Sequence, residues 1–160
     1  MPDWRNLRWL WVSATVVVLD LWTKWLAEAN LERFRPVEVL PFFNLRLTYN
    51  PGAAFSLLAD AGGWQRWFFA LVAVVASVVI LVWLVRLRGE RMVACGLTLV
   101  LGGALGNLWD RIFRGEVVDF LDFHWAGWHF PAFNVADMAI TVGAALLILD
   151  LFLHKDTHEH

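Results

Sequence analysis

Charged residues are scarce in this sequence. Asp, Glu, Lys and Arg make up 18% of its 160 residues, whereas a typical soluble domain contains about 25%. The net charge of −2 gives no indication of a nucleic-acid-binding surface. Apolar residues reach 59%, so much of the chain must be hidden from water.

Cysteine is almost absent as well, because the chain has a single one, Cys95, inside an apolar run. One cysteine excludes an intrachain disulfide and a metal site built from several thiolates. No serine lies in a nucleophile-elbow motif, Cys95 has no histidine partner in reach, and no glycine-rich phosphate loop is present. Serine or cysteine hydrolysis and nucleotide binding are therefore not indicated.

Long apolar segments dominate what is present. Residues 67–85 and 92–109 contain no charged residue, and about 20 apolar residues cross a bilayer core. Many of the 11 tryptophans flank the apolar runs, as interfacial anchors do. We therefore predict a mainly α fold: a single membrane domain over residues 1–160, with a bundle of four transmembrane helices. The predicted spans are residues 9–28, 67–85, 92–110 and 135–153.

The first predicted span holds two charged residues, Asp20 and Lys24. Their i, i+4 spacing puts them on one helix face, where pairing lowers the cost of placing charge in a membrane. We interpret the pair as a structural tether near the helix end, with Lys24 extending to the interface; a catalytic role is the alternative. Because these charges interrupt the apolar run, the segment is expected to be a retained helix, not a cleaved signal peptide.

The segments 30–65 and 111–134 are too polar to span, and we expect both to lie on the periplasmic side. In the first, apolar and polar residues alternate strictly over Phe43–Asn50, which predicts a half-buried strand. Pro51 and Gly52 then favour a turn. Asn50 is interpreted as a turn former, with a role in a site as the alternative.

The third predicted span ends in a polar face. Gly102 and Gly106 form a small-xxx-small pair that lets another helix approach closely. Gly103, Asn107 and Arg111 follow at i, i+4 and i+8, hence on one face. Arg111 is either an interfacial anchor or a clamp for a phosphate or a peptide carbonyl.

Two aspartates are the best candidates for chemistry. Asp119 lies among Val and Phe residues, so burial is expected to raise its pKa. Asp137 lies in the first turn of a predicted helix, where the helix dipole favours a carboxylate. A protonated acid beside an ionised one is the arrangement that general acid/base hydrolysis requires. The ionised group would take a proton from water, which attacks a carbonyl, while the other would polarise the carbonyl oxygen and protonate the leaving amine.

Several structural interpretations of these residues stay open at this point. Asn134 with Asp137 resembles a helix cap, which alone would explain both. Asp122 is as acidic as Asp119 and only three residues away. Asp110 and Arg114 are spaced to pair along a helix end. A metal site from His124, His129 and Asp119 can be drawn, but it matches no recognised ligand spacing.

Four spans put both termini on one side of the membrane. Lys and Arg outside the spans are evenly divided, but three arginines fall within the short connector at residues 86–91. Because short loops carry the positive-inside signal, the connector and both termini are predicted to be cytoplasmic. The polar residues of the predicted site then gather at the outer face.

Five motifs in order resemble lipoprotein signal peptidase (signal peptidase II), a family of bacterial intramembrane aspartyl proteases. The resemblance covers about residues 9–153. Leu21 departs from it, since Gln is usual at this position. The motifs are Asp20–Lys24, Asn50–Phe55, Gly102–Arg111, Val117–Phe120 and Phe133–Asp137.

The resemblance implies Asp119 and Asp137 as the catalytic pair and demotes Asp122. It implies substrate-binding or supporting roles for Asn50, Gly52, Asn107, Arg111 and Asn134, and stabilising roles for Asp20 and Lys24. The implied substrate is a prolipoprotein carrying diacylglycerol on its future N-terminal cysteine, cleaved just before that residue. The resemblance also implies no cofactor and no metal, a multi-pass protein of the bacterial inner membrane, and inhibition by cyclic peptides of the globomycin type. A monomer is expected, and membrane lipid is a further partner.

Two other classes compete with this hypothesis. A small transporter with Asp20, Lys24 and Arg111 on its path is disfavoured, because no repeat or discontinuous helix pair is evident. A scaffold packing through Gly102 and Gly106 would tolerate substitution of the aspartates.

Overall fold

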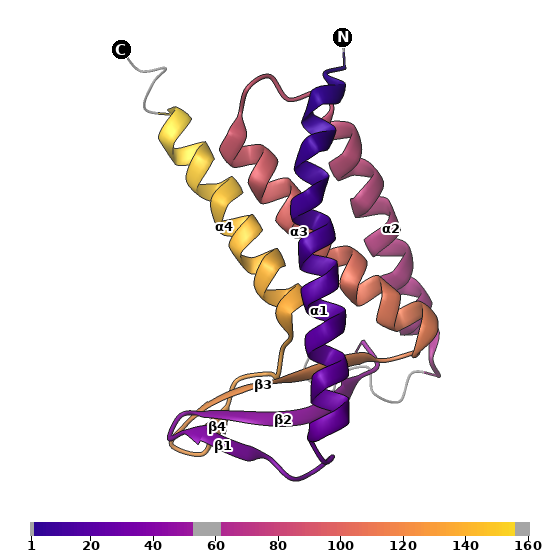
Figure 1. The fold of residues 1–160 in the computed structure, drawn as a ribbon, viewed down its shortest axis with the longest axis vertical. Helices are drawn as coiled ribbons and strands as arrows, with labels where there is room; N and C mark the ends of the chain where they lie inside the picture. Colours follow the sequence, from indigo (N-terminus) through magenta and orange to yellow (C-terminus); the bar gives the residue numbers. More distant parts are fainter. Residues whose placement is uncertain (1, 53–61, 156–160) are drawn as a thin grey trace.

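The computed structural model describes residues 2–52 and 62–155, which contain four long helices and a four-stranded sheet (Figure 1). A short 3-10 helix, η1, precedes the first long helix. The helices are η1 (Trp4–Trp9), α1 (Leu10–Asn30), α2 (Trp64–Leu84), α3 (Arg91–Phe113) and α4 (Val135–Lys155). The strands are β1 (Val37–Leu40), β2 (Phe43–Asn50), β3 (Val117–Trp125) and β4 (Trp128–His129).

The outward faces of the helices are apolar. Each long helix is long and apolar enough to cross a membrane. In α2, for example, Leu71, Val75 and Val79 are each more than half exposed. Contiguous exposed apolar surface of this kind is unfavourable in water and suits contact with lipid. The four-helix membrane fold with a small strand region is thereby confirmed.

Helix α3 packs against the other three long helices through small residues (Figure 1). A Cβ atom at Gly102 would lie 2.7 Å from the Cβ of Val16 in α1. At Gly106 it would lie 2.5 Å from Oδ2 of Asp20 and 3.4 Å from the Cβ of Ala136 in α4. The close helix approach predicted for Gly102 and Gly106 is therefore confirmed.

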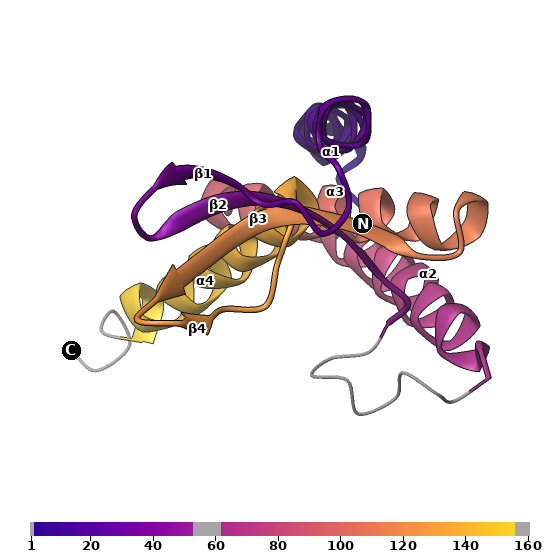
Figure 2. The same ribbon diagram turned by 90° about the horizontal axis from the view of Figure 1, so that it is seen from below.

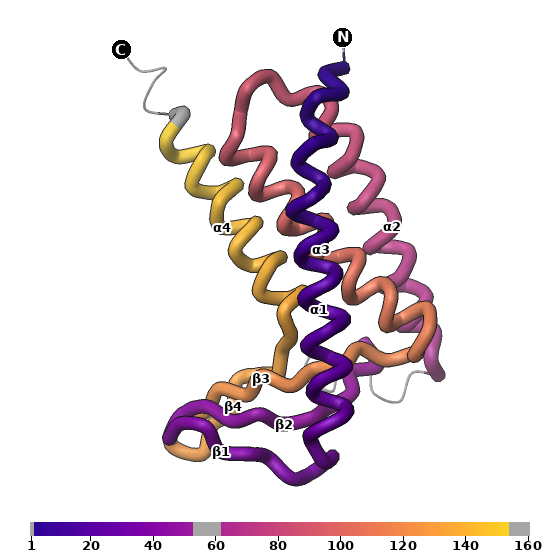
Figure 3. Tube along the Cα trace, in the orientation of Figure 1, coloured from indigo at the N-terminus to yellow at the C-terminus, as the bar shows by residue number. Residues whose placement is uncertain are grey.

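The sheet lies at one end of the bundle, and its strands follow the order β1-β2-β3-β4, all antiparallel. Seen along the helices, α1 lies beside the sheet, whereas α4 runs behind β3 and β4 (Figure 2). Ala27 of α1 packs with Leu47, Val118 and Phe120 in a buried apolar cluster. The chain passes from α3 through β3 and β4 into α4 (Figure 3), so β3 connects the ends of these two helices.

Strand β2 has the predicted bounds, but β3 was not predicted. The segment 111–134 was predicted only to be too polar to span the membrane, and no strand was assigned to it. The structure forms a nine-residue strand there, Val117–Trp125, whose first four residues are all buried. A strand buried on both faces shows no alternation, so its period could not be recognised in the sequence.

Candidate active site

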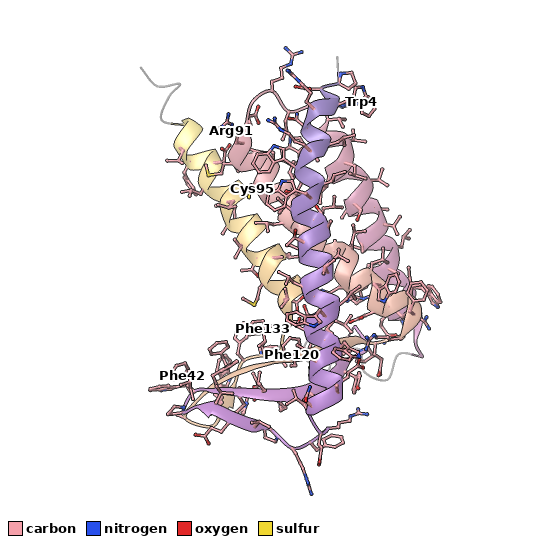
Figure 4. All side chains as sticks on the ribbon, in the orientation of Figure 1. Trp4, Phe42, Arg91, Cys95, Phe120 and Phe133 are labelled. Atoms are coloured by element: carbon pink, nitrogen blue, oxygen red, sulfur yellow. The ribbon has the colours of Figure 1, made fainter. Side chains whose placement is uncertain are left out.

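Asp119 and Asp137 lie at the junction of sheet and bundle. Asp119 is on β3 and Asp137 is in the first turn of α4. Figure 4 labels two residues at this junction: Phe120, which follows Asp119 in β3, and Phe133, which lies just before α4. The two carboxyls are close enough for the charge of one to act on the other. The structure therefore brings together two acids that are 18 positions apart in the chain.

Asn134 connects the two acids directly. Its side chain is fully buried, and its Nδ2 donates to Oδ1 of Asp119 at 2.8 Å and to the carbonyl oxygen of Val118 at 3.1 Å. Its Oδ1 accepts a hydrogen bond from the backbone N–H of Asp137 at 2.9 Å. One amide thus fixes the position of Asp119 relative to the first turn of α4.

The capping interpretation of Asn134 and Asp137 also holds. The side chain of Asn134 accepts from the N–H of Asp137, and Oδ2 of Asp137 accepts from the N–H of Asn134 at 3.3 Å. This reciprocal pair is a capping box. Its geometry leaves Asp137 Oδ1 to accept from Nδ2 of Asn107 at 2.8 Å. Capping and a place in the site are therefore not alternatives, because the cap holds the carboxylate in position.

Burial, together with the nearby charge of Asp137, raises the pKa of Asp119 to about 7. The side chain is 3% exposed. Hydrogen bonds from Asn50 and Asn134 act in the opposite direction. The upward shift expected from the sequence is confirmed, and near neutral pH this group can both hold and release a proton.

This raised pKa predicts that Asp119→Asn becomes relatively more stable as the pH rises. The unfolded chain loses the proton near pH 4 and the folded protein near pH 7, so the wild type loses stability as pH rises between them. Asparagine resembles the protonated acid at every pH. Between pH 5 and 8 the variant should gain about 3 kcal/mol relative to wild type, measured as unfolding midpoints in detergent. Glu32→Gln, at an exposed acid, is the control, and parallel pH curves for wild type and Asp119→Asn would contradict the prediction.

Lys24 is fully buried. This position differs from the prediction that its side chain extends to the interface. Its Nζ lies 2.6 Å from Oδ2 of Asp20 and 2.9 Å from Oδ2 of Asp110, and it donates to Oδ1 of Asn107 at 3.1 Å. The predicted pairing with Asp20 is confirmed. The interface position was wrong because the sequence did not show that Asp110 and Asn107 would supply further partners. Lys24 therefore orients Asn107, which in turn contacts Asp137.

Asp20 and Asp110, the two carboxylates that contact Lys24, also bond to the backbone segments that carry Asp119 and Asp137. Oδ1 of Asp20 accepts from the backbone N–H of Ala136 at 2.8 Å, one residue before Asp137. Oδ2 of Asp110 accepts from the N–H of Val118 at 3.1 Å, one residue before Asp119. The sequence predicted only that Asp110 pairs with Arg114, which it does at 3.3 Å. The backbone contact could not be predicted, because it depends on the path of β3.

Arg111 lies beside the acids on the predicted face of α3. Its guanidinium is close enough to Asp137 and Asp119 for attraction between the charges. It also donates to the carbonyl oxygen of Asn107 at 3.4 Å and lies over the ring of Phe69 at 5.3 Å. Its Nε is buried without a hydrogen-bond partner among the described residues. A donor of this kind is available to an acceptor on a bound molecule.

Asn50 serves both as a turn former and as a neighbour of the site. Its Oδ1 accepts from the N–H of Gly52 at 2.8 Å, closing the turn, and its side chain hydrogen-bonds to Asp119. Gly52 has φ +103°, and a Cβ there would lie 2.9 Å from Phe69. Glycine is therefore required at this position. Residues 53–55 of the Asn50–Phe55 motif lie outside the described residues.

Asp122 is excluded from the pair by the alternation of β3. It lies three residues after Asp119 and so points to the opposite face of the strand. There it is fully buried, 2.9 Å from Nδ1 of His129 and 3.4 Å from Nδ2 of Asn44. His129 thus contacts Asp122 and not Asp119. No group of three or more metal-ligating side chains forms among residues 2–52 and 62–155.

An apolar groove of about 520 Å³ opens beside Asp137. Its walls come from the segment before α4 and from the first two turns of that helix. A carboxyl at the mouth of an apolar groove is suited to a substrate with a hydrocarbon portion. The groove is lined by Phe130, Pro131, Ala132, Phe133, Asp137, Met138, Thr141 and Val142.

The fold and this site together define a class: a multi-pass membrane protein with a buried and a half-buried carboxyl, both hydrogen-bonded, at one end of its helix bundle. Comparison with known proteins identifies the family within this class. Residues 12–153 match the family model described as signal peptidase (SPase) II.

Curated relatives and solved structures agree with this match. A lipoprotein signal peptidase of Pseudomonas fluorescens (strain Pf0-1) is 56% identical over 157 residues, covering 96% of this chain and 92% of that protein. One from Alteromonas mediterranea is 52% identical and covers 94% of this chain and 84% of its own length. A bacterial membrane enzyme solved by the in meso method at 2.3 Å superimposes with a TM-score of 0.84 at 27% identity, covering 99% of this chain and 95% of that chain.

The chain therefore belongs to the signal peptidase II family of aspartic peptidases. The resemblance inferred from the five motifs and the predicted peptidase activity are confirmed. The protein is a multi-pass bacterial membrane enzyme.

Proposed function

We propose that Asp119 and Asp137 are the catalytic pair and that they hydrolyse a prolipoprotein just before its diacylglyceryl-modified cysteine. The observation that carries this proposal is the shared contact with Asn134, whose side chain bonds to Asp119 and to the backbone of Asp137. Two acids held in this way, one with a pKa near 7, have the properties that acid/base hydrolysis needs.

In the proposed reaction Asp137 is the base. It lies at the N-terminus of α4 and accepts hydrogen bonds from Asn107 and from the N–H of Asn134, surroundings that suit an anion. Its carboxylate takes a proton from a water molecule, and the water oxygen attacks the scissile carbonyl carbon. Protonated Asp119 donates a hydrogen bond to the carbonyl oxygen and so stabilises the oxyanion of the tetrahedral intermediate.

Collapse of the intermediate breaks the C–N bond. The proton of Asp119 passes to the departing amine nitrogen, which belongs to the lipidated cysteine, and the signal peptide leaves with a new carboxyl group; Asp119 is then ionised and Asp137 protonated. The two acids exchange their protonation states during the cycle, so they titrate as a pair. No metal or organic cofactor is required for these steps.

The neighbouring features support the same substrate. The unpartnered Nε of Arg111 would bind a peptide carbonyl near the scissile bond. The apolar groove beside Asp137 would hold hydrocarbon from the substrate's lipid or apolar signal helix. Asn50 and Gly52 would support the position of Asp119, while Asp20 and Lys24 stabilise the bundle beneath the pair.

The proposed setting is the bacterial inner membrane, with both termini cytoplasmic and the sheet at the periplasmic surface. The arginine-rich connector at residues 86–91 supports this orientation. We further propose that the enzyme acts as a monomer and that cyclic peptides of the globomycin type occupy the same site.

The substrate assignment is tested with purified wild-type enzyme and two forms of one prolipoprotein, with and without diacylglycerol on the cysteine. We expect cleavage of the lipidated form only, at the bond just before the cysteine, because the groove is apolar and adjoins Asp137. Mass spectrometry of both products identifies the bond. Equal cleavage of the two forms, or cleavage elsewhere, would contradict the proposed substrate.

A further inference from the structure

A second pocket lies at the end of the bundle away from the sheet. It has a volume of about 280 Å³ and is formed by the N-terminal segment, the connector between α2 and α3, and the start of α3. Figure 4 shows Trp4 and Arg91 at this end, far from Phe42 at the tip of the sheet. The lining residues are Asp3, Arg5, Asn6, Arg8, Trp9, Gly89, Glu90, Arg91 and Ala94.

Hydrogen bonds hold the walls of this pocket together. Asn6 is buried, and its Nδ2 donates to the carbonyl oxygens of Leu84 at 3.1 Å and Leu87 at 2.9 Å. The backbone N–H of Asp3 donates to the carbonyl oxygen of Val85 at 2.7 Å. The N-terminal segment is therefore fastened over the end of α2, and the pocket is a built feature of the fold.

The charges that line the pocket leave two guanidinium groups available. Arg5 is engaged by Asp3, with Nε 3.0 Å from Oδ1 and Nη2 3.2 Å from Oδ2. Arg8 and Arg91 are exposed. Arg8 attracts Asp3 through its charge without a side-chain hydrogen bond to it, and Asp3 is already hydrogen-bonded to Arg5. Glu90 is the remaining carboxylate, so the unpaired lining charge is positive.

The first turn of α3 adds backbone donors. Arg91 begins this helix, and Glu90 at its N-cap makes no side-chain hydrogen bond to the first turn. The first N–H groups of a helix have no partner within it and favour an anion. Guanidinium groups and free N–H donors at the same pocket match the oxygens of a phosphate group.

We propose that this pocket binds the phosphate of an anionic lipid headgroup. A lipid source is favoured over free phosphate because the pocket lies where the hydrocarbon-length helices α1 and α3 begin, at the depth where headgroups lie. Trp9 lines the pocket and Trp4 is 66% exposed beside it, as expected for side chains at the lipid–water interface. The site is separate from the catalytic pair at the opposite end of the bundle.

The test measures binding of phosphatidylglycerol to delipidated full-length enzyme in detergent, by titration with native mass spectrometry. Phosphatidylcholine and inorganic phosphate are titrated in parallel. We expect saturable binding of one phosphatidylglycerol and at least tenfold weaker binding in Arg8→Gln/Arg91→Gln, since each interfacial arginine contributes appreciably to anionic lipid binding. Arg86→Gln/Arg88→Gln removes the same charge from the same end without touching the pocket, and it should change binding less than about threefold.

Each other result would overturn the proposal. Equal losses in the two double variants would show diffuse attraction to the arginines and not a pocket. Unchanged binding in Arg8→Gln/Arg91→Gln would show that the lipid does not bind in this pocket. Inorganic phosphate binding as tightly as phosphatidylglycerol would show that the ligand is not a lipid headgroup. Unfolding midpoints of both variants are compared with wild type, and an unchanged midpoint with lost binding separates ligand contact from folding.

Discussion

Asp119→Asn and Asp137→Asn are each expected to lower the rate of prolipoprotein processing by at least about a thousandfold. Asparagine can occupy the same space and accept a hydrogen bond from Asn134 or Asn107, but it can neither take a proton from water nor give one to the leaving amine. The fold should persist, because asparagine at position 119 still offers an oxygen to Nδ2 of Asn134, and asparagine at position 137 still offers one to Nδ2 of Asn107 or to the N–H of Asn134. The measurement is the single-turnover cleavage rate of diacylglyceryl prolipoprotein by purified enzyme.

Asp122→Asn is the matched control. Asp122 is an equally buried acid on the same strand, but it faces His129 on the opposite side of the sheet. It should keep most of the wild-type cleavage rate. If the variant at Asp119 or Asp137 retains more than about a tenth of the wild-type cleavage rate, that residue is not a catalytic acid or base.

Lys24→Met is expected to destabilise the protein by about 3–5 kcal/mol, the range for removing one partner of a buried ion pair. The side chain is fully buried between Asp20 and Asp110, and its loss leaves Asp20 without its cationic partner and Asp110 with Arg114 alone. The amide of Asn107 also loses a partner, so the base Asp137 is less well positioned. The unfolding midpoint in detergent and the yield of folded protein measure the effect.

A second substitution distinguishes unpaired charge from lost packing. In Lys24→Met/Asp20→Asn the surplus negative charge is removed, while the asparagine oxygen can still accept from the N–H of Ala136. Stability should recover in part. If the double variant is less stable than Lys24→Met, the cost comes from packing and the ion-pair account is wrong.

The helices were predictable because each apolar run is long enough to cross a bilayer, and that signal needs no tertiary information. The polar face of Asn107 and Arg111 followed from helical spacing alone. The sheet was mostly missed: β2 alternates and was predicted with its correct ends, but β3 is buried on both faces and carries two acids, which conceals its period.

Local reasoning could not choose the site residues by itself. From spacing, Asp122 was nearly as good as Asp119, and Asp137 was fully explained as a cap. The resemblance to the family favoured Asp119 and Asp137, and the face of β3 gives the physical reason, since only Asp119 points toward Asn134. The contacts of Lys24 with Asp110 and of Asp110 with Val118 join distant segments, so no local pattern could reveal them.

These contacts also explain why a membrane protein keeps so many buried polar groups. Asp20, Lys24, Asn107 and Asp110 satisfy one another, and they bond to the backbone just before each candidate catalytic acid. A satisfied network is rigid, whereas the same groups unpaired would be costly in lipid. We infer that the network positions the two acids before substrate arrives.

The most direct test of the paired acids compares cleavage rates of Asp119→Asn, Asp137→Asn and the double variant on one lipidated prolipoprotein. Groups that act as one unit do not contribute independently, so the double variant should be about as slow as either single variant. Rates that fall multiplicatively in the double variant, or a single variant that cleaves at the wild-type rate, would show that the two carboxyls do not work together.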